Sequence, residues 1–151
     1  MKKSILYLFP VVSVISIVIA LLLPVVRLDG LYSFWIFGYP FFPWEVVHIF
    51  DIPLKIIFSM IVGLLLLLTI SIFLLRKYPD RLNIISTIWL GSGIGIIILA
   101  FLWITSWNLA AISFAPLSST FEFAIFIPFI SGTVLIFGKI YAYIFSRQIE
   151  E

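Results

Sequence analysis

Long runs of hydrophobic residues, separated by short polar stretches, divide this chain into four parts. The runs cover residues 5–26, 54–75, 84–107 and 121–145. Each exceeds the roughly 18 apolar residues that a helix needs to cross about 30 Å of hydrocarbon. The pattern therefore predicts a single domain, residues 1–151, built as a bundle of four transmembrane helices without a soluble domain.

Composition strengthens this prediction. Of 151 residues, 64% are hydrophobic and 11% are charged, and the mean hydropathy is +1.29. Soluble domains contain roughly 45–50% apolar residues. The chain has no cysteine, which excludes disulfides and thiolate metal sites. We expect an all-α integral membrane protein with lipid as a neighbour and without nucleic acid as a partner.

The basic residues predict which side of the membrane each connection faces. Cytoplasmic connections carry an excess of Lys and Arg. Residues 108–120 contain neither, and the first outer connection has only Arg27 and Lys55 at its ends. We therefore expect a multi-pass protein of the cell membrane with both termini in the cytoplasm. The basic residues of the cytoplasmic side would be Lys2, Lys3, Arg76, Lys77, Arg81, Lys139 and Arg147.

Local sequence signals suggest where several helices begin. Asp51, before Ile52 and Pro53, is typical of an N-cap followed by a proline in the first turn. Residues 119–122 match the S-x-x-E capping box, in which Glu122 would bond first-turn amides. Asp80 or Asn83 could cap the third helix.

Two prolines and two lysines fall within the apolar runs or at their ends. Pro10 and Pro128 are predicted to kink their helices, because proline removes a backbone hydrogen bond. Lys55 and Lys139 are close enough to helix ends for their ammonium groups to reach the interface. No run has an ionisable residue near its centre, which disfavours a transporter or proton pump.

Small residues indicate where the helices could pack against one another. Lipid tails are as apolar as leucine, so inserted helices associate by close packing at small side chains. The candidates are Gly91 and Gly95 in a G-x-x-x-G pattern, Ser16 and Ala20 in the first helix, and Gly132 in the fourth. We favour internal contacts of the bundle, although a dimer or partner contact stays open.

The first outer connection, residues 29–51, is long and rich in aromatic residues. Residues 31–37 are β-prone and residues 38–40 could turn them back as a hairpin, while residues 43–50 could form a short interfacial helix. Trp103 and Trp107 would join the same aromatic belt at the membrane surface. A contiguous apolar surface of this kind suits a partner subunit. The predicted partner-facing residues are Tyr32, Phe34, Trp35, Phe37, Tyr39, Phe41 and Trp44.

Glu45, His48 and Asp51 form the chain's one cluster of candidate ligands. Glu45 and His48 have the E-x-x-H spacing that di-iron bundles use twice, but here it occurs once. A complete metal site within the chain is therefore not expected, whereas a site completed by a partner subunit stays open. A single histidine also excludes bis-histidine haem ligation. We predict no cofactor, no catalytic residue and no soluble small-molecule substrate.

The layout of four helices with a long first outer connection resembles the claudin and peripheral-myelin-protein class. Gly30-Leu31-Tyr32 is similar to the G-L-W of that class, but the paired cysteines of its loop are absent here. No functional residue is carried over from this resemblance. It implies one candidate function, a free-standing four-span adhesion or scaffold protein.

The preferred hypothesis is a small accessory subunit, without activity of its own, of a larger membrane complex such as a respiratory or other redox enzyme. Its partners would be other integral membrane subunits. A second hypothesis is an enzyme component that contributes Glu45, His48 or Asp51 to a shared metal or quinone site. The free-standing scaffold is the third.

Overall fold

The computed structural model describes residues 4–28, 32–34, 48–113 and 119–150. Most of these residues are helical. The helices are α1 (Ser4–Leu22), α2 (His48–Lys77), α3 (Leu82–Ser113) and α4 (Ile127–Glu150), with the 3-10 turns η2 (Pro79–Arg81) and η3 (Phe123–Phe126). Three short strands are β1 (Val26–Leu28), β2 (Tyr32–Phe34) and β3 (Ser119–Phe121).

Four helical segments are long and apolar enough to cross a membrane: Ser4–Leu22, Pro53–Lys77, Pro79–Leu109 and Phe123–Arg147. They coincide with the four predicted runs. The main difference is at α2, which begins at His48. Asp51 therefore lies within the first turn of α2, and its prediction as an N-cap is wrong.

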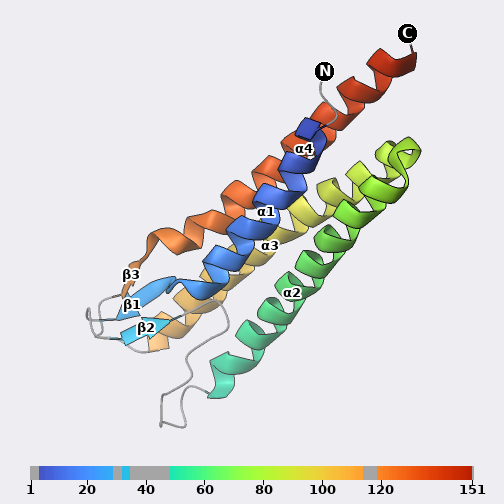
Figure 1. Ribbon diagram of the computed structural model, residues 1–151. Coiled ribbons are helices and arrows are strands. Elements are labelled where there is room, and N and C mark those ends of the chain that lie inside the picture. The colour runs from blue at the N-terminus through green and yellow to red at the C-terminus, as the bar shows by residue number, and fades with distance from the viewer. Residues whose placement is uncertain (1–3, 29–31, 35–47, 114–118, 151) are drawn as a thin grey trace.

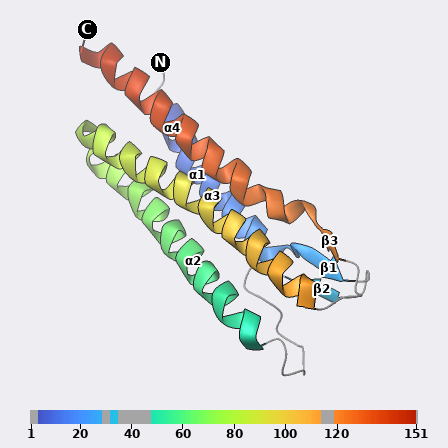
Figure 2. The same cartoon turned by 180° about the vertical axis from the view of Figure 1, so that it is seen from behind.

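The helices run up and down in one bundle (Figures 1 and 2). α3 packs most extensively on α4, α1 packs on α4, and α2 packs on α3, while the contact between α1 and α2 is smaller. Both chain termini and η2 lie at one end, which we call the terminal end. The three strands lie at the opposite end, which we call the sheet end.

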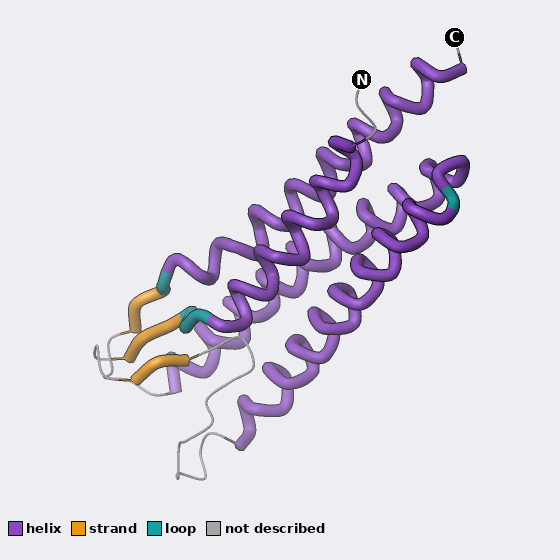
Figure 3. The backbone as a smooth tube through the Cα atoms, viewed as in Figure 1, coloured by secondary structure: helices purple, strands orange, loops and turns teal. Residues whose placement is uncertain are grey.

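The strands form one antiparallel sheet in the order β2-β1-β3 (Figure 3). Arg27 of β1 pairs with Ser33 of β2 on one side and with Thr120 of β3 on the other. The structure thus pairs β2 with the strand before it, and the second connection supplies the third strand. The predicted turn at residues 38–40 lies outside the described residues. These strands are the exception to the all-α prediction.

Two other local predictions are corrected at the start of α4. Residues 119–121 form β3, and Glu122 makes no capping hydrogen bond from its side chain, so the capping box does not form. Pro128 is the second residue of α4, directly after η3. Proline is well tolerated in a first turn, where its missing N–H needs no partner. Pro10 is buried inside α1.

The core extends along the whole bundle and is built from every helix. Trp89 of α3 is completely buried, as are Leu68 of α2 and Leu135 of α4. Val25 and Val26 continue this core into the sheet end. α2 buries the smallest share of its span, 22% against 44% for the spans of α3 and α4. The outward faces are apolar as well, as expected for helices surrounded by lipid.

Candidate interaction surfaces and the polar groups of the bundle

At the sheet end, backbone pairing and one ion pair join the two connections. The backbone N–H of Glu122 donates to the carbonyl oxygen of Val25 at 2.9 Å, next to the β1–β3 pairing. The Arg27 Nε atom lies 3.0 Å from Glu122 Oε1, and both side chains are partly exposed. The chain that leaves α1 is therefore fastened to the chain that enters α4.

Two of the predicted partner-facing residues belong to this sheet. Tyr32 and Phe34 belong to β2, beside β1. The others, Trp35, Phe37, Tyr39, Phe41 and Trp44, lie outside the described residues.

The candidate ligands lie next to this region in sequence. His48 and Asp51 occupy the first turn of α2, three residues apart in sequence. Glu45 lies outside the described residues. Within the described part of the chain, no group of three or more His, Cys, Asp or Glu residues is placed to hold a metal ion.

Trp103 and Trp107 belong to the core instead of a surface belt. They are 2% and 7% exposed. Their rings stack with centroids 5.8 Å apart and planes 2° from parallel. The aromatic-belt prediction is wrong for this pair, because α3 turns both rings inward toward its neighbours.

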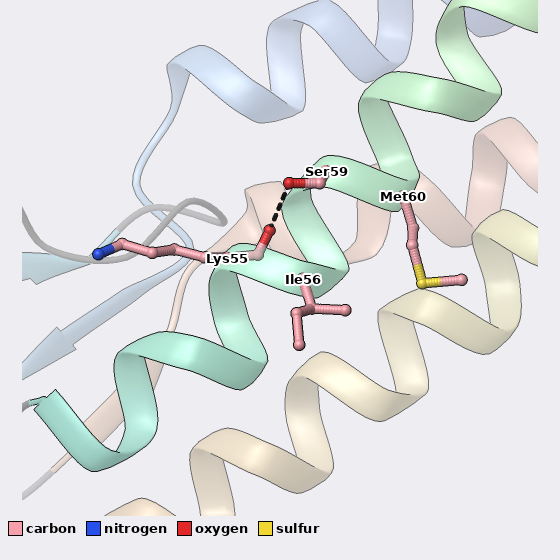
Figure 4. A pocket seen from close by; sticks show the side chains of 4 residues that line it. All are labelled: Lys55, Ile56, Ser59 and Met60. Carbon is pink, nitrogen blue, oxygen red and sulfur yellow. Dashed lines mark hydrogen bonds between the residues drawn. The ribbon is translucent and has the colours of Figure 1, made fainter.

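An open depression of about 430 Å³ lies on the outer surface of α2 near the sheet end. It is lined by Lys55, Ile56, Ser59 and Met60, all of them exposed. Figure 4 shows the Lys55 ammonium pointing away from Ile56 and Met60, while Ser59 Oγ donates to the Lys55 carbonyl oxygen at 2.8 Å. The depression is an apolar part of the helix surface with one cation at its edge.

Inside the bundle, polar side chains join helices to one another. Ser13 Oγ donates to the Ser131 carbonyl oxygen at 3.1 Å, and Ser131 Oγ donates to the Ser13 carbonyl oxygen at 3.2 Å. This reciprocal pair links α1 to α4. Trp89 Nε1 donates to Ser71 Oγ at 2.9 Å and links α3 to α2. Neither contact was predicted from the sequence.

Two glycines bring the backbones of α3 and α4 close together. A Cβ atom on Gly93 would lie 2.7 Å from the Gly132 carbonyl oxygen, and one on Gly132 would lie 2.6 Å from the Gly93 carbonyl oxygen. The glycines of the G-x-x-x-G pattern face elsewhere. Gly95 packs against Leu64 of α2. A Cβ atom on Gly91 would meet no atom of another helix or side chain within 4 Å. In α1, Ala20 is buried and Ser16 is partly buried.

At the terminal end, Lys139 of α4 is bound by the first turns of α3. Its Nζ lies 2.8 Å from Asn83 Oδ1, 3.2 Å from the Asn83 carbonyl oxygen, 3.3 Å from Ser86 Oγ and 3.1 Å from Thr87 Oγ1. An ammonium group has three hydrogens, so the four oxygens share them. Lys139, which lies midway along α4, therefore joins α4 to the start of α3.

No family model, curated protein or solved structure matches this chain.

Proposed function

We propose that this chain is a small multi-pass subunit of a larger membrane complex and has no active site of its own. It would lie in the cell membrane with its termini in the cytoplasm and its sheet end outside. The first outer connection would dock on other integral membrane subunits, and a respiratory or other redox enzyme is one class of complex that such a subunit would suit.

The observation that carries this proposal is the identity of the buried polar side chains. Among the described residues they are five serines: Ser13, Ser71, Ser86, Ser92 and Ser131. Ser13 and Ser131 bond each other's helices, and Ser71 accepts from Trp89 while donating to the Leu68 carbonyl oxygen. Ionisable groups that move protons or ions normally face the interior of a bundle. Ser13, Ser131 and Ser71 hold helices together instead, which supports a structural role.

The sheet end supports the choice of docking surface. The β1–β3 pairing and the Arg27–Glu122 ion pair hold both ends of the outer region in place. The aromatic residues of the first connection follow β2 directly in sequence. A surface attached to a prearranged sheet loses less conformational entropy on docking than a free loop would.

Native mass spectrometry of the chain, purified from its own membranes in a mild detergent, tests this function. We expect the chain to be recovered with larger membrane subunits. Recovery as a monodisperse monomer would overturn the subunit proposal and favour the free-standing scaffold. Metal or quinone recovered with the complex and lost in a His48→Ala variant would favour a shared site instead.

A pair of variants tests the docking surface separately. Trp35→Ser with Phe37→Ser should release the partner subunits, since it removes two predicted anchors. Phe123→Ser with Phe126→Ser is the matched control, because these phenylalanines are also at the sheet end and are 70% and 53% exposed. Retention of partners by the first variant, or equal loss in both, would contradict docking through the first connection.

A further inference from the structure

Three exposed cations of the terminal end gather around the turn between α2 and α3. Arg76 and Lys77 end α2, and Arg81 ends η2. The turn is fixed by two backbone hydrogen bonds, from Tyr78 N–H to the Leu74 carbonyl oxygen at 2.7 Å and from Arg81 N–H to the Tyr78 carbonyl oxygen at 3.1 Å. We call Arg76, Lys77 and Arg81, together with Tyr78, the basic patch.

The aromatic ring at the centre of the basic patch holds two of its cations. Lys77 Nζ lies 5.2 Å from the Tyr78 ring centroid, and the Arg81 guanidinium lies 5.9 Å from it. On α4, the Arg147 guanidinium lies 4.7 Å from the Tyr143 ring centroid. These distances are within the range of cation–π attraction. Both rings are exposed, so the cations stay at the surface.

The basic patch has no carboxylate partner within the described residues. The Arg27–Glu122 ion pair lies at the opposite end of the bundle, the sheet end. Asp80 lies in the same turn as Arg81 but is not within salt-bridge distance of any described cation. The positive charge of the patch is therefore available to an anion outside the chain.

Exposed apolar side chains adjoin the basic patch and show what kind of surface it borders. Phe73, three residues before the patch on α2, is 67% exposed, and Ile84, three residues after it on α3, is 64% exposed. Tyrosine, with an apolar ring and a polar hydroxyl, favours the level of lipid headgroups. A soluble polyanion such as nucleic acid would not cover those apolar side chains, whereas a lipid offers both an acyl chain and a phosphate.

We propose that the basic patch binds the headgroups of anionic phospholipids in the leaflet at the terminal end. This inference rests on the membrane insertion contained in the proposed function. Each Lys or Arg beside an anionic membrane surface should raise the affinity for an anionic lipid by roughly fivefold. The attraction is Coulombic between exposed groups, so salt should screen it.

The test uses the full-length chain, reconstituted in nanodiscs that contain equal amounts of dioleoyl phosphatidylglycerol and dioleoyl phosphatidylcholine. The acyl chains are identical, so only the headgroups differ. After transfer to detergent, native mass spectrometry gives the ratio of the two lipids retained on the protein. We expect phosphatidylglycerol to be enriched, and we expect this enrichment to disappear in 1 M salt.

Two double variants locate the binding surface. Lys77→Gln with Arg81→Gln should lower the enrichment on the order of tenfold or more. Arg27→Gln with Lys55→Gln removes the same charge from the sheet end and should leave most of the enrichment in place. All four side chains are exposed, so each double variant should fold.

The outcomes separate this inference from the proposed function. Equal retention of the two lipids by an inserted wild-type chain would overturn lipid selection alone. An equal loss in both double variants, or enrichment that survives 1 M salt, would overturn the basic patch as its cause. A chain that does not enter nanodiscs would overturn membrane insertion, and both proposals with it.

Discussion

At the residue scale, the helices of this bundle meet where side chains are smallest. Gly93 and Gly132 bring the backbones of α3 and α4 together, and Ser13 and Ser131 do the same for α1 and α4 through reciprocal hydrogen bonds. Dispersion and hydrogen bonding between closely approaching backbones are the forces available to helices in lipid. A single added methyl group at such a contact should therefore be costly.

Gly132→Ala should destabilise the bundle by about 1–3 kcal/mol, the usual cost of overpacking. The new Cβ would lie 2.6 Å from both the Gly93 carbonyl oxygen and Ile97 Cγ1, so backbone as well as side chain would have to move. Gly91→Ala is the matched control on the facing helix, because its Cβ would meet no neighbour within 4 Å. Reversible unfolding in mixed detergent micelles measures both.

The control should unfold at or above the wild-type midpoint, because alanine favours helix over glycine. Equal stability of Gly132→Ala and Gly91→Ala would contradict the assigned contact between α3 and α4.

The sequence identified Gly132 as a packing candidate but could not choose the correct glycine on α3. Gly91, Gly93 and Gly95 lie within five residues, and each successive residue turns about 100° around the helix. In a soluble protein the polar face would show which of them points outward. Here Ile94 is exposed and Ile96 is buried, so hydrophobicity does not separate the inner face from the outer one.

At the element scale, the sheet connects parts of the chain that are far apart in sequence. β1 and β3 are about ninety residues apart, and each contains three residues. Strands this short show no recognisable alternation of hydrophobic and polar residues, and they gain stability only from the strands they pair with. The sequence therefore predicted the helices well, whereas the strand pairing depends on how α1 and α4 bring their ends together.

The S-x-x-E pattern shows the same limit. Residues 119–122 satisfy the capping-box motif, yet strand pairing takes up the first three and Arg27 takes the Glu122 carboxylate. A local motif predicts a local hydrogen bond only where no tertiary partner competes for the same groups.

Disulfide formation tests the sheet register, since the chain has no cysteine of its own. Arg27→Cys with Thr120→Cys places two thiols on directly opposed residues, where Cα atoms about 4.5–5.5 Å apart suit a disulfide. Mild oxidation should cross-link this variant, which a gel after proteolysis between the two cysteines detects.

Arg27→Cys with Phe121→Cys is the control. A shift of one residue turns the second side chain to the other face of the sheet, so this pair should cross-link much more slowly. Both variants lose the Arg27–Glu122 ion pair, so that loss cannot explain a difference. Equal rates would contradict the register.

At the scale of the whole molecule, charge differs between the two ends of the bundle. Arg76, Lys77, Arg81, Lys139 and Arg147 all belong to the terminal end of the bundle, the end that contains η2 and the last turns of α4. The sheet end has Arg27, already paired with Glu122, and Lys55. The sequence predicted this division of charge. With four spanning helices, both termini and the connection between the second and third helices must lie at the same end, and the basic residues are in those segments.

Labelling of single cysteines tests the resulting orientation. Thr120→Cys lies at the sheet end and Asp80→Cys at the terminal end, and both positions are exposed. Because the basic residues should remain in the cytoplasm, a membrane-impermeant maleimide applied to intact cells should label Thr120→Cys alone. Asp80→Cys should react only after permeabilisation.

The opposite labelling pattern would mean that the molecule is inverted in the membrane, with the sheet and the aromatic connection on the cytoplasmic side. That result would contradict docking at an outer surface. Labelling of both positions in intact cells would contradict a transmembrane arrangement, since the sheet and the turn would then share one side.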